Sequence, residues 1–380
     1  MKVPGVVIDH SPAESGRYIG SPSIAVLPDA TYLASHDFFG PKADHERSAS
    51  SAVFSSRDQG ATWEKIAEIR PLLWGKLFLH QDDLYLLGTH HEYGEVLLYR
   101  SGDGGRTWTQ PHDSRTGLLR EGRHHCAPCP TLVQDGRIWR SMERFTGGAW
   151  GHFSAAVMSA PVDADLLNAA SWTFSRALPK PQEFTWLEGN VLPGPDGRIL
   201  DLLRTNDGGK DRAAMVHVAD EGKTLSYDPE RDFIRLPGGG AKFTIRFDKT
   251  TSRYWAVVNK QTKPEAFRNN LLLTSSVDLR TWQIEAPLLY HPDKEKHAWQ
   301  YVDWQFDGED IIFVSRTAFD DGLGGAHSAH DANYLTFHRI QGFRKGWPEC
   351  VPRERNRTSK SGSGSGLEKV PVLDRCEREP

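Results

Sequence analysis

SRDQGATW, residues 56–63, follows a short apolar run, and its pattern returns twice along the chain. The other copies are SGDGGRTW at 101–108 and SVDLRTW at 276–282, the last without the glycine. In such a segment the aspartate accepts hydrogen bonds from the N–H groups of a turn, the glycine takes a positive φ, and the tryptophan packs between neighbouring sheets. Three copies, each after an apolar run, predict a protein built from repeated β-sheets.

A second series of polar turns divides the chain between Tyr18 and Arg344 into six similar units. Each turn follows one apolar strand and precedes another, and the turns recur about every 50 to 60 residues, the size of a four-stranded sheet with its loops. They lie at 28–30, 81–83, 134–136, 195–197, 248–252 and 307–310. We therefore predict an all-β propeller of six four-stranded antiparallel blades and leave open a seventh, degenerate blade. The segment VPGVVI at 3–8 is expected to form the outermost strand of the last blade and to close the ring.

Composition supports this fold and limits the range of functions. The chain has 380 residues, 35 glycines, 23 prolines and 10% aromatic residues, which suits short strands and tight turns. Its net charge of −4 does not indicate a partner such as nucleic acid or an anionic membrane surface, and no apolar run reaches the length of a membrane span. We assign residues 1–345 to a single propeller domain and residues 346–380 to a flexible, charged Gly/Ser tail outside the fold.

Other features leave cofactor, compartment and assembly undecided. Cys126 and Cys129 have C-x-x-C spacing, but no second close pair completes a zinc site, so we interpret them as buried, unreactive thiols. No secretory signal is visible at the N-terminus, so the compartment is not predicted. The oligomeric state is not predicted either.

Each repeating unit turns from apolar to polar at the end of its second strand. In a propeller these ends share one mouth of the central channel with the starts of the inner strands, because successive strands alternate in direction. The predicted second strands end at His36, His90, Glu143-Arg144, Arg204–Asn206, Asn259-Lys260 and Arg316. The predicted inner strands start at Arg17, Arg123–His125, Trp186–Glu188, Lys242 and Trp299–Tyr301. Arginines bind carboxylates with two parallel hydrogen bonds and indole rings stack on sugars, so this ring predicts a site for an anionic sugar. The alternative is that strand ends are polar simply because they meet water.

The repeated segments resemble the Asp-box of sialidase-type β-propellers, and the resemblance extends over about residues 1–345. Within that superfamily, YIGSPSIAVLPD at 18–29 and ASHDFFG at 34–40 are most similar to propeller enzymes that act on rhamnose–glucuronate caps of plant glycans. Those enzymes are described as rhamnosidases and as rhamnose–glucuronate lyases. The resemblance implies an L-rhamnose–α-1,4-D-glucuronate lyase acting by β-elimination, or the related rhamnosidase activity. It also implies a chemical role for His36, which matches the first-blade histidine of that group.

Elimination assigns roles to residues of the predicted ring. A base removes the proton on C5 of a uronate, while cations or hydrogen bonds neutralise the carboxylate into which negative charge spreads. We predict His36 as the base, and His90 or Tyr301 as the acid that protonates the leaving oxygen on C4. The predicted substrate-binding residues are Arg17, Arg123, His125, Arg144, Glu188, Asn190, Arg204, Asn259 and Arg316. The scheme needs no cofactor or catalytic metal, and a structural cation in the channel is left open.

Two other functions are compatible with the sequence. An exo-α-sialidase uses three arginines, a tyrosine nucleophile assisted by a glutamate, and an aspartic acid; the resemblance offers Arg17, Asp37, Glu188, Arg204 and Tyr301. Against it, the Arg-Ile-Pro start typical of that family reads RYIGSP at 17–22, and Lys242, a point charge, stands where the third arginine is expected. A non-catalytic glycan-binding propeller would keep the arginines and tryptophans without needing paired histidines. The sequence does not identify the exact sugar, or exo against endo action.

Overall fold

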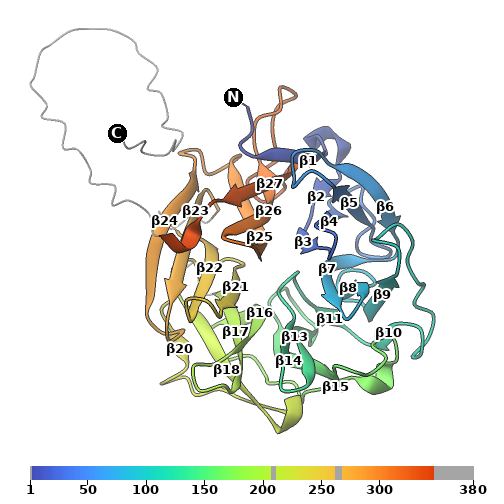
Figure 1. Ribbon diagram of the computed structural model, residues 1–380, viewed down its shortest axis with the longest axis vertical. Coiled ribbons are helices and arrows are strands. Elements are labelled where there is room, and N and C mark those ends of the chain that lie inside the picture. Colours follow the sequence, from blue (N-terminus) through green and yellow to red (C-terminus); the bar gives the residue numbers. More distant parts are fainter. Residues whose placement is uncertain (1, 207–210, 262–267, 346–380) are drawn as a thin grey trace, which may run out of the picture.

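A computed structural model describes residues 2–206, 211–261 and 268–345, which form six antiparallel sheets arranged as a ring around a channel (Figure 1). This arrangement confirms the predicted all-β propeller with six four-stranded blades, and the described residues contain no seventh blade. The predicted tail, residues 346–380, lies outside the described residues. The described part of the chain contains no helix with the length and apolar character that a membrane crossing needs.

Blades one to three follow one another along the first half of the chain. Blade one contains β2 (Tyr18–Ile19), β3 (Ser23–Val26), β4 (Tyr32–Phe39), β5 (Ser51–Ser56) and β6 (Glu64–Ile69). Blade two contains β7 (Leu73–His80), β8 (Asp83–Thr89), β9 (Val96–Ser101) and β10 (Leu118–Arg120). Blade three contains β11 (His124–His125), β12 (Leu132–Gln134), β13 (Arg137–Phe145), β14 (Phe153–Pro161) and β15 (Thr173–Phe174). In blades one and three two short strands share the innermost position, because both pair with the second strand of the blade.

Blades four to six complete the ring. Blade four contains β16 (Thr185–Pro193), β17 (Ile199–Asn206), β18 (Ala213–Ala219), β19 (Thr224–Ser226) and the short β20 (Phe233–Ile234). Blade five contains β21 (Thr244–Asp248), β22 (Arg253–Asn259), β23 (Asn270–Ser276) and β24 (Trp282–Tyr290). Blade six contains β25 (Ala298–Asp307), β26 (Asp310–Ala318), β27 (Tyr334–Ile340) and β1 (Val6–His10), which confirms that the N-terminal strand closes the ring. Short 3₁₀ turns lie in the loops, at η1 (Ala13–Ser15), η2 (Ala169–Ser171), η3 (Asp220–Gly222) and η4 (Phe343–Lys345).

The three repeated segments form the same tight turn. In the first, Asp58 accepts a hydrogen bond from the N–H of Thr62 at 2.9 Å and another from its hydroxyl at 2.6 Å. In the second, Asp103 makes the equivalent bonds to Thr107 at 2.9 and 2.6 Å. In the third, Leu279 takes the positive φ, 62°, at the turn that lacks the glycine. Each turn joins the third and fourth strands of its blade, so the alternating strand direction places it on the face opposite to the inner-strand starts.

A buried carboxylate on the innermost strand of blade six connects four blades near the channel axis. Asp303 has no exposed surface, and its Oδ2 accepts hydrogen bonds from the N–H of Ile24 at 2.9 Å and the hydroxyl of Ser23 at 3.0 Å, both in blade one. The same oxygen is paired with the ammonium of Lys76 in blade two. Arg246 of blade five lies 3.7 Å from its Oδ1. Asp303 therefore holds the inner strands of blades one, two, five and six in register.

We predict that Asp303→Asn lowers the free energy of unfolding by about 3–5 kcal/mol, because it leaves the buried ammonium of Lys76 without its charged partner. Urea unfolding followed by circular dichroism measures the change. Asp196→Asn is the control, because that carboxylate forms an exposed pair with Arg198 and its loss is expected to change stability little. An Asp303→Asn protein as stable as the Asp196→Asn control would contradict the prediction.

Candidate functional site

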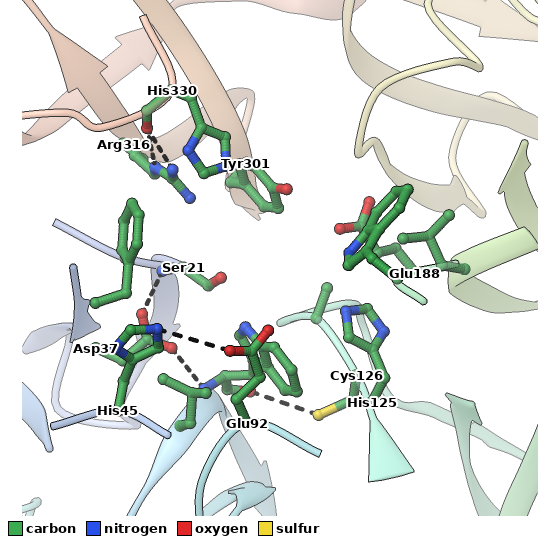
Figure 2. Close-up of a pocket in the computed structure, with 17 residues that line it drawn as sticks. Ser21, Asp37, His45, Glu92, His125, Cys126, Glu188, Tyr301, Arg316 and His330 are labelled. Atoms are coloured by element: carbon green, nitrogen blue, oxygen red, sulfur yellow. Dashed lines mark hydrogen bonds and ion pairs between the residues drawn. The ribbon is translucent and has the colours of Figure 1, made fainter. Parts of the chain in front are cut away.

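A cavity of about 170 Å³ opens at the end of the channel where the inner strands begin (Figure 2). Blades one, two, three, four and six all contribute to its wall, which carries carboxylates, imidazoles, an arginine and several aromatic rings. Its volume is below the range of about 300–1,000 Å³ that is usual for drug-sized ligands. A cavity of this size and polarity suits a single sugar unit better than a length of chain.

Three lining residues occupy the same position in alternate blades. Trp74, Glu188 and Tyr301 have φ of 56°, 59° and 54°, and each lies where the pairing of its inner strand with the second strand shifts register. Such an irregularity turns a side chain that would otherwise follow the regular alternation of the strand, and here all three side chains line the cavity. A non-glycine residue at positive φ costs about 1–3 kcal/mol, and such strain is concentrated at functional sites.

Glu188 forms a buried ion pair with a neighbouring arginine. Its Oε2 lies 2.9 Å from Nη1 of Arg204, whose Nε donates to the carbonyl of Gly240 at 3.0 Å. Burial acts to raise the pKa of Glu188, but the guanidinium of Arg204 outweighs it and holds the pKa below its usual value. Glu188 is therefore a carboxylate at neutral pH, and the positive charge of Arg204 is already balanced within the fold.

Arg316 is the cation of the cavity that the fold does not balance. Its side chain is buried, and Nε and Nη2 donate to the carbonyl of His330, with the Nε bond at 3.0 Å. The guanidinium lies 4.8 Å from the ring centroid of Tyr301 and 4.4 Å from that of Phe39. Among the residues that the structure describes, no carboxylate lies within ion-pair distance of it, and burial lowers the pKa of Arg316 to about 10. Arg268 approaches the Tyr301 ring as well, at 5.4 Å, so the tyrosine lies beside two guanidinium groups.

Asp37 lies on the blade-one side of the cavity. Its Oδ1 accepts from the N–H of Ser21 at 2.6 Å and its Oδ2 from the N–H of Trp74 at 2.5 Å, which ties blade one to blade two (Figure 2). Burial raises the pKa of Asp37. A side chain at Gly20 would clash with this carboxyl, since an added Cβ would lie 1.5 Å from Oδ1. Glycine is therefore required at that position.

Four of the residues that the sequence suggested for the site lie together in the cavity wall: His125, Glu188, Tyr301 and Arg316. Arg204 lies behind them and reaches the cavity through Glu188. Asp37, suggested for the sialidase alternative, also lines the cavity.

His36, the predicted base, lies outside the lining and bridges the closing strand to blade one. Its Nε2 is 2.8 Å from Oδ2 of Asp9 on β1, and its Nδ1 is 2.9 Å from the carbonyl oxygen of Asp37. Both ring nitrogens are therefore engaged by groups within the fold. The ring also stacks on Phe54 at 5.6 Å. These contacts support a structural role, and the proposal below gives His36 no part in the chemistry.

Six further predicted residues also lie outside the lining. Two are buried amides that bridge neighbouring blades: Asn190 accepts from the N–H of Ile245 at 3.0 Å, and Asn259 donates to the carbonyl of Trp299 at 2.7 Å. The others are half-buried or exposed, namely His90, Arg17, Arg123 and Arg144. Arg17, His90 and Arg123 lie in loops, outside the strands whose ends the sequence pattern could align. For a residue on a strand, a shift of one position turns the side chain to the other face.

Several lining residues were not anticipated from the sequence. Trp74 had a readable signal, because Leu-Trp-Gly at 73–75 matches Leu-Glu-Gly at 187–189 on the equivalent inner strand. Trp150, half exposed at 52%, lies in the glycine-rich loop GGAWG at 147–151. His45, Glu92 and His330 come from loops that follow no repeat, so no pattern in the sequence could have placed them here.

Three clusters of described histidines and carboxylates are compact enough to hold a cation: His90, His91 and Glu95; His291, Asp293 and His297; and His45, Glu46 and Glu92. The last cluster borders the cavity, where Nε2 of His45 lies 3.7 Å from Oε2 of Glu92. No step proposed below depends on a cation at any of them.

The buried pair between Glu188 and Arg204 predicts a pH-dependent stability. Because the folded-state pKa of Glu188 is below its ordinary value of 4.5, the pair stabilises the fold above that pH, and this contribution is lost as the pH falls through the folded-state pKa. Glu188→Gln should cost about 3–5 kcal/mol at pH 7 and progressively less below about pH 4.5. Urea unfolding of both proteins across this range measures the difference, and a cost independent of pH would contradict the assignment.

No protein-family model matches the sequence, and the comparison with curated proteins found no match. Solved structures do match the fold. A protein of unknown function from Dyadobacter fermentans gives a TM-score of 0.61 at 14% identity over 90% of this chain and 98% of its own. The α-L-arabinanase of Penicillium chrysogenum, complexed with arabinobiose, gives 0.54 at 14% identity over 91% and 99%. The sialidase of Trypanosoma rangeli, in complex with sialic acid, gives 0.57 at 14% identity over 90% of this chain and 58% of its own. At these identities the comparisons establish the fold alone, a β-propeller that the arabinanase and sialidase structures share.

Proposed function

We propose that the protein is a carbohydrate-active enzyme that cleaves a glycan at an acidic sugar bound in the cavity. The observation that carries this proposal is Arg316, a buried guanidinium in the cavity wall with no carboxylate partner among the described residues. A buried charge without a partner costs several kcal/mol, and a carboxylate of a bound sugar would offset that cost. The guanidinium plane presents parallel N–H donors that match a carboxylate.

The shape of the surface favours attack at the end of a chain. The cavity of about 170 Å³ adjoins a wider depression of about 560 Å³, and both are lined by Phe39 and His45. Tyr18 and Phe39 give the depression an aromatic side on which a second sugar can stack. The acidic sugar then occupies the cavity, and the unit linked to it occupies the depression.

The reaction that we favour is β-elimination at a uronate, with a rhamnose–glucuronate linkage as the first substrate to test. Arg316 neutralises the carboxylate as negative charge spreads into it. The hydroxyl of Tyr301, beside Arg316 and Arg204, protonates the leaving oxygen on C4. His36 does not line the cavity and both of its ring nitrogens have partners within the fold, so we assign the C5 proton to another base in the cavity.

Hydrolysis of a terminal acidic sugar, as in a sialidase, is the second candidate. The observation that favours it is that two carboxyl groups line the same cavity and their pKa values are shifted in opposite directions. Burial raises the pKa of Asp37, which suits a proton donor, whereas Arg204 keeps Glu188 ionised. Tyr301 would then be the nucleophile. The names of the arabinanase and sialidase structures with this fold support a carbohydrate substrate for either reaction.

The charge preference can be tested without knowing the reaction. We predict that D-glucuronate or N-acetylneuraminate raises the melting temperature of the protein, whereas D-glucose at the same concentration does not, because only the acids supply a partner for Arg316. In Arg316→Ala this difference should disappear. Arg106→Ala is the control, because Arg106 is exposed in the turn on the opposite face. Equal effects of glucose and glucuronate on the wild-type protein would refute the preference for an acid.

The two reactions leave different products. Elimination creates a C4–C5 double bond conjugated with the carboxylate, so we predict a rise in ultraviolet absorbance with rhamnose-capped glucuronate glycans. Hydrolysis gives no such rise and would instead release the fluorophore from a fluorogenic sialoside. Tyr301→Phe should reduce kcat by at least about 100-fold in either case. Binding without turnover of both substrates would identify a glycan-binding propeller in place of an enzyme.

A further inference from the structure

His125 and Glu143 form a buried pair at the edge of the cavity. They lie directly opposite each other in the antiparallel pairing of β11 with β13, so their side chains share one face of blade three. Nδ1 of His125 lies 2.8 Å from Oε2 of Glu143, and both side chains are buried. The register of the sheet therefore fixes this contact.

The imidazole of His125 is held between aromatic rings. It stacks on Phe153 at 4.6 Å and meets the edge of Trp74 at 4.5 Å. His125 lines the cavity on the same side as Glu188 (Figure 2). Among the described residues no hydrogen bond engages Nε2, so this nitrogen is the one left for a ligand.

Glu143 makes one further contact and lies near a second carboxyl group. Its Oε1 accepts from the N–H of Gly189 at 3.3 Å. Burial and the nearby charge of Glu143 raise the pKa of Asp201 to about 8, so Asp201 keeps its proton at neutral pH and does not compete as a second carboxylate. The hydroxyl of Ser141 donates to Asp201 at 2.8 Å. The imidazole therefore faces one carboxylate, Glu143, at Nδ1.

We propose that His125 is the base that accepts the substrate proton in the cavity, and that Glu143 positions it. The inference rests on the proposed function and supplies the base that elimination lacks. Donation from Nδ1–H to Glu143 fixes the tautomer that keeps a lone pair on Nε2, and the carboxylate stabilises the imidazolium that forms.

The step balances without a further reactant. Nε2 of His125 takes the proton from C5, and the electrons of that bond form the C4–C5 double bond. The C4–O bond breaks, its electron pair goes to the leaving oxygen, and that oxygen takes the proton of the Tyr301 hydroxyl. His125 belongs to blade three and Tyr301 to blade six, so the base and the acid come from different blades.

Other candidates for the base are weaker. Glu188 is neutralised by Arg204, and its pKa is below the usual value. The positive charge of Arg316, with burial, lowers the pKa of His330 to about 4, which makes it a poor proton acceptor. His125 combines a free nitrogen, a fixed ring and a carboxylate behind it.

Kinetics on a rhamnose-capped glucuronate glycan test these roles. His125→Ala should lose at least about 100-fold in kcat and regain part of it with added imidazole. Glu143→Gln keeps the shape of the side chain and should lower kcat by about 10–100-fold with little change in KM. His112→Ala is the matched control, since His112 is exposed in a loop outside the cavity. Far-ultraviolet circular dichroism and melting curves confirm that each variant is folded.

The pH profile separates positioning from a merely structural role. The charges that face His125 are Glu143 and the Glu188–Arg204 pair, with the Tyr93 ring nearby. Removing the negative charge of Glu143 makes the imidazolium less stable, so the acidic limb of the kcat profile should move to lower pH in Glu143→Gln. An unchanged profile, or full activity in His125→Ala, would overturn the proposal.

A measurement without substrate keeps this inference separate from the proposed function. Long-range ¹H–¹⁵N spectra of the whole protein report the tautomer of each histidine, and the signal that disappears in His125→Ala belongs to His125. Above neutral pH this signal should show the Nδ1–H tautomer. In Glu143→Gln the preference for that tautomer should be weaker. An Nε2–H tautomer in the wild type would refute the pairing even if the glycan is cleaved. If no acidic glycan is cleaved while the Nδ1–H tautomer is seen, the proposed function fails and the positioning by Glu143 stands.

Discussion

The buried carboxylate of Asp303 is the contact on which the ring depends, because a propeller has little covalent continuity between its blades. Each blade is a hairpin-connected sheet that packs on its neighbours through apolar side chains, and such packing alone tolerates sliding. Asp303 adds directional bonds to blades one and two and a cation from blade five. Directional contacts of this kind fix the positions of the inner strands along the channel axis. They therefore also fix the positions of the residues that line the cavity.

The same inner strands that carry this network also build the site. Lys76 and Asp303 each follow, by two residues, a residue at positive φ whose side chain lines the cavity, Trp74 and Tyr301. The irregularity in strand pairing thus gives two nearby side chains different directions. The side chain of Trp74 or Tyr301 lines the cavity, and the side chain two residues later, Lys76 or Asp303, takes part in the buried ion pair. The backbone strain at the residue with positive φ is tolerated because the residue two positions later is held by buried hydrogen bonds and ion pairs.

The sequence could predict the fold because its signals are local and repeated. Asp58 and Asp103 form turns through hydrogen bonds within a few residues, and repetition at a constant spacing identifies the blades. The site depends instead on which way each strand end faces, and a shift of one residue reverses that direction. Tyr301 and Arg316 were placed correctly in the cavity wall, whereas His36 faces the closing strand, because strand polarity alone does not reveal whether a polar side chain meets a ligand or another strand.

A contrast between buried cations supports the proposal that the cavity binds an acidic ligand. Lys76 and Arg204 each have a carboxylate partner inside the fold, so their burial is balanced in the free protein. Among the described residues, Arg316 is held by a backbone carbonyl and by aromatic rings, which orient it without forming an ion pair. A fold that needed this arginine only for stability would be better served by a carboxylate neighbour or an apolar residue. Arg140 and Lys242 are also buried and are held by carbonyl oxygens. Arg316 differs from them because it lines the cavity, so under the proposed function its charge is the one that an acidic ligand can reach.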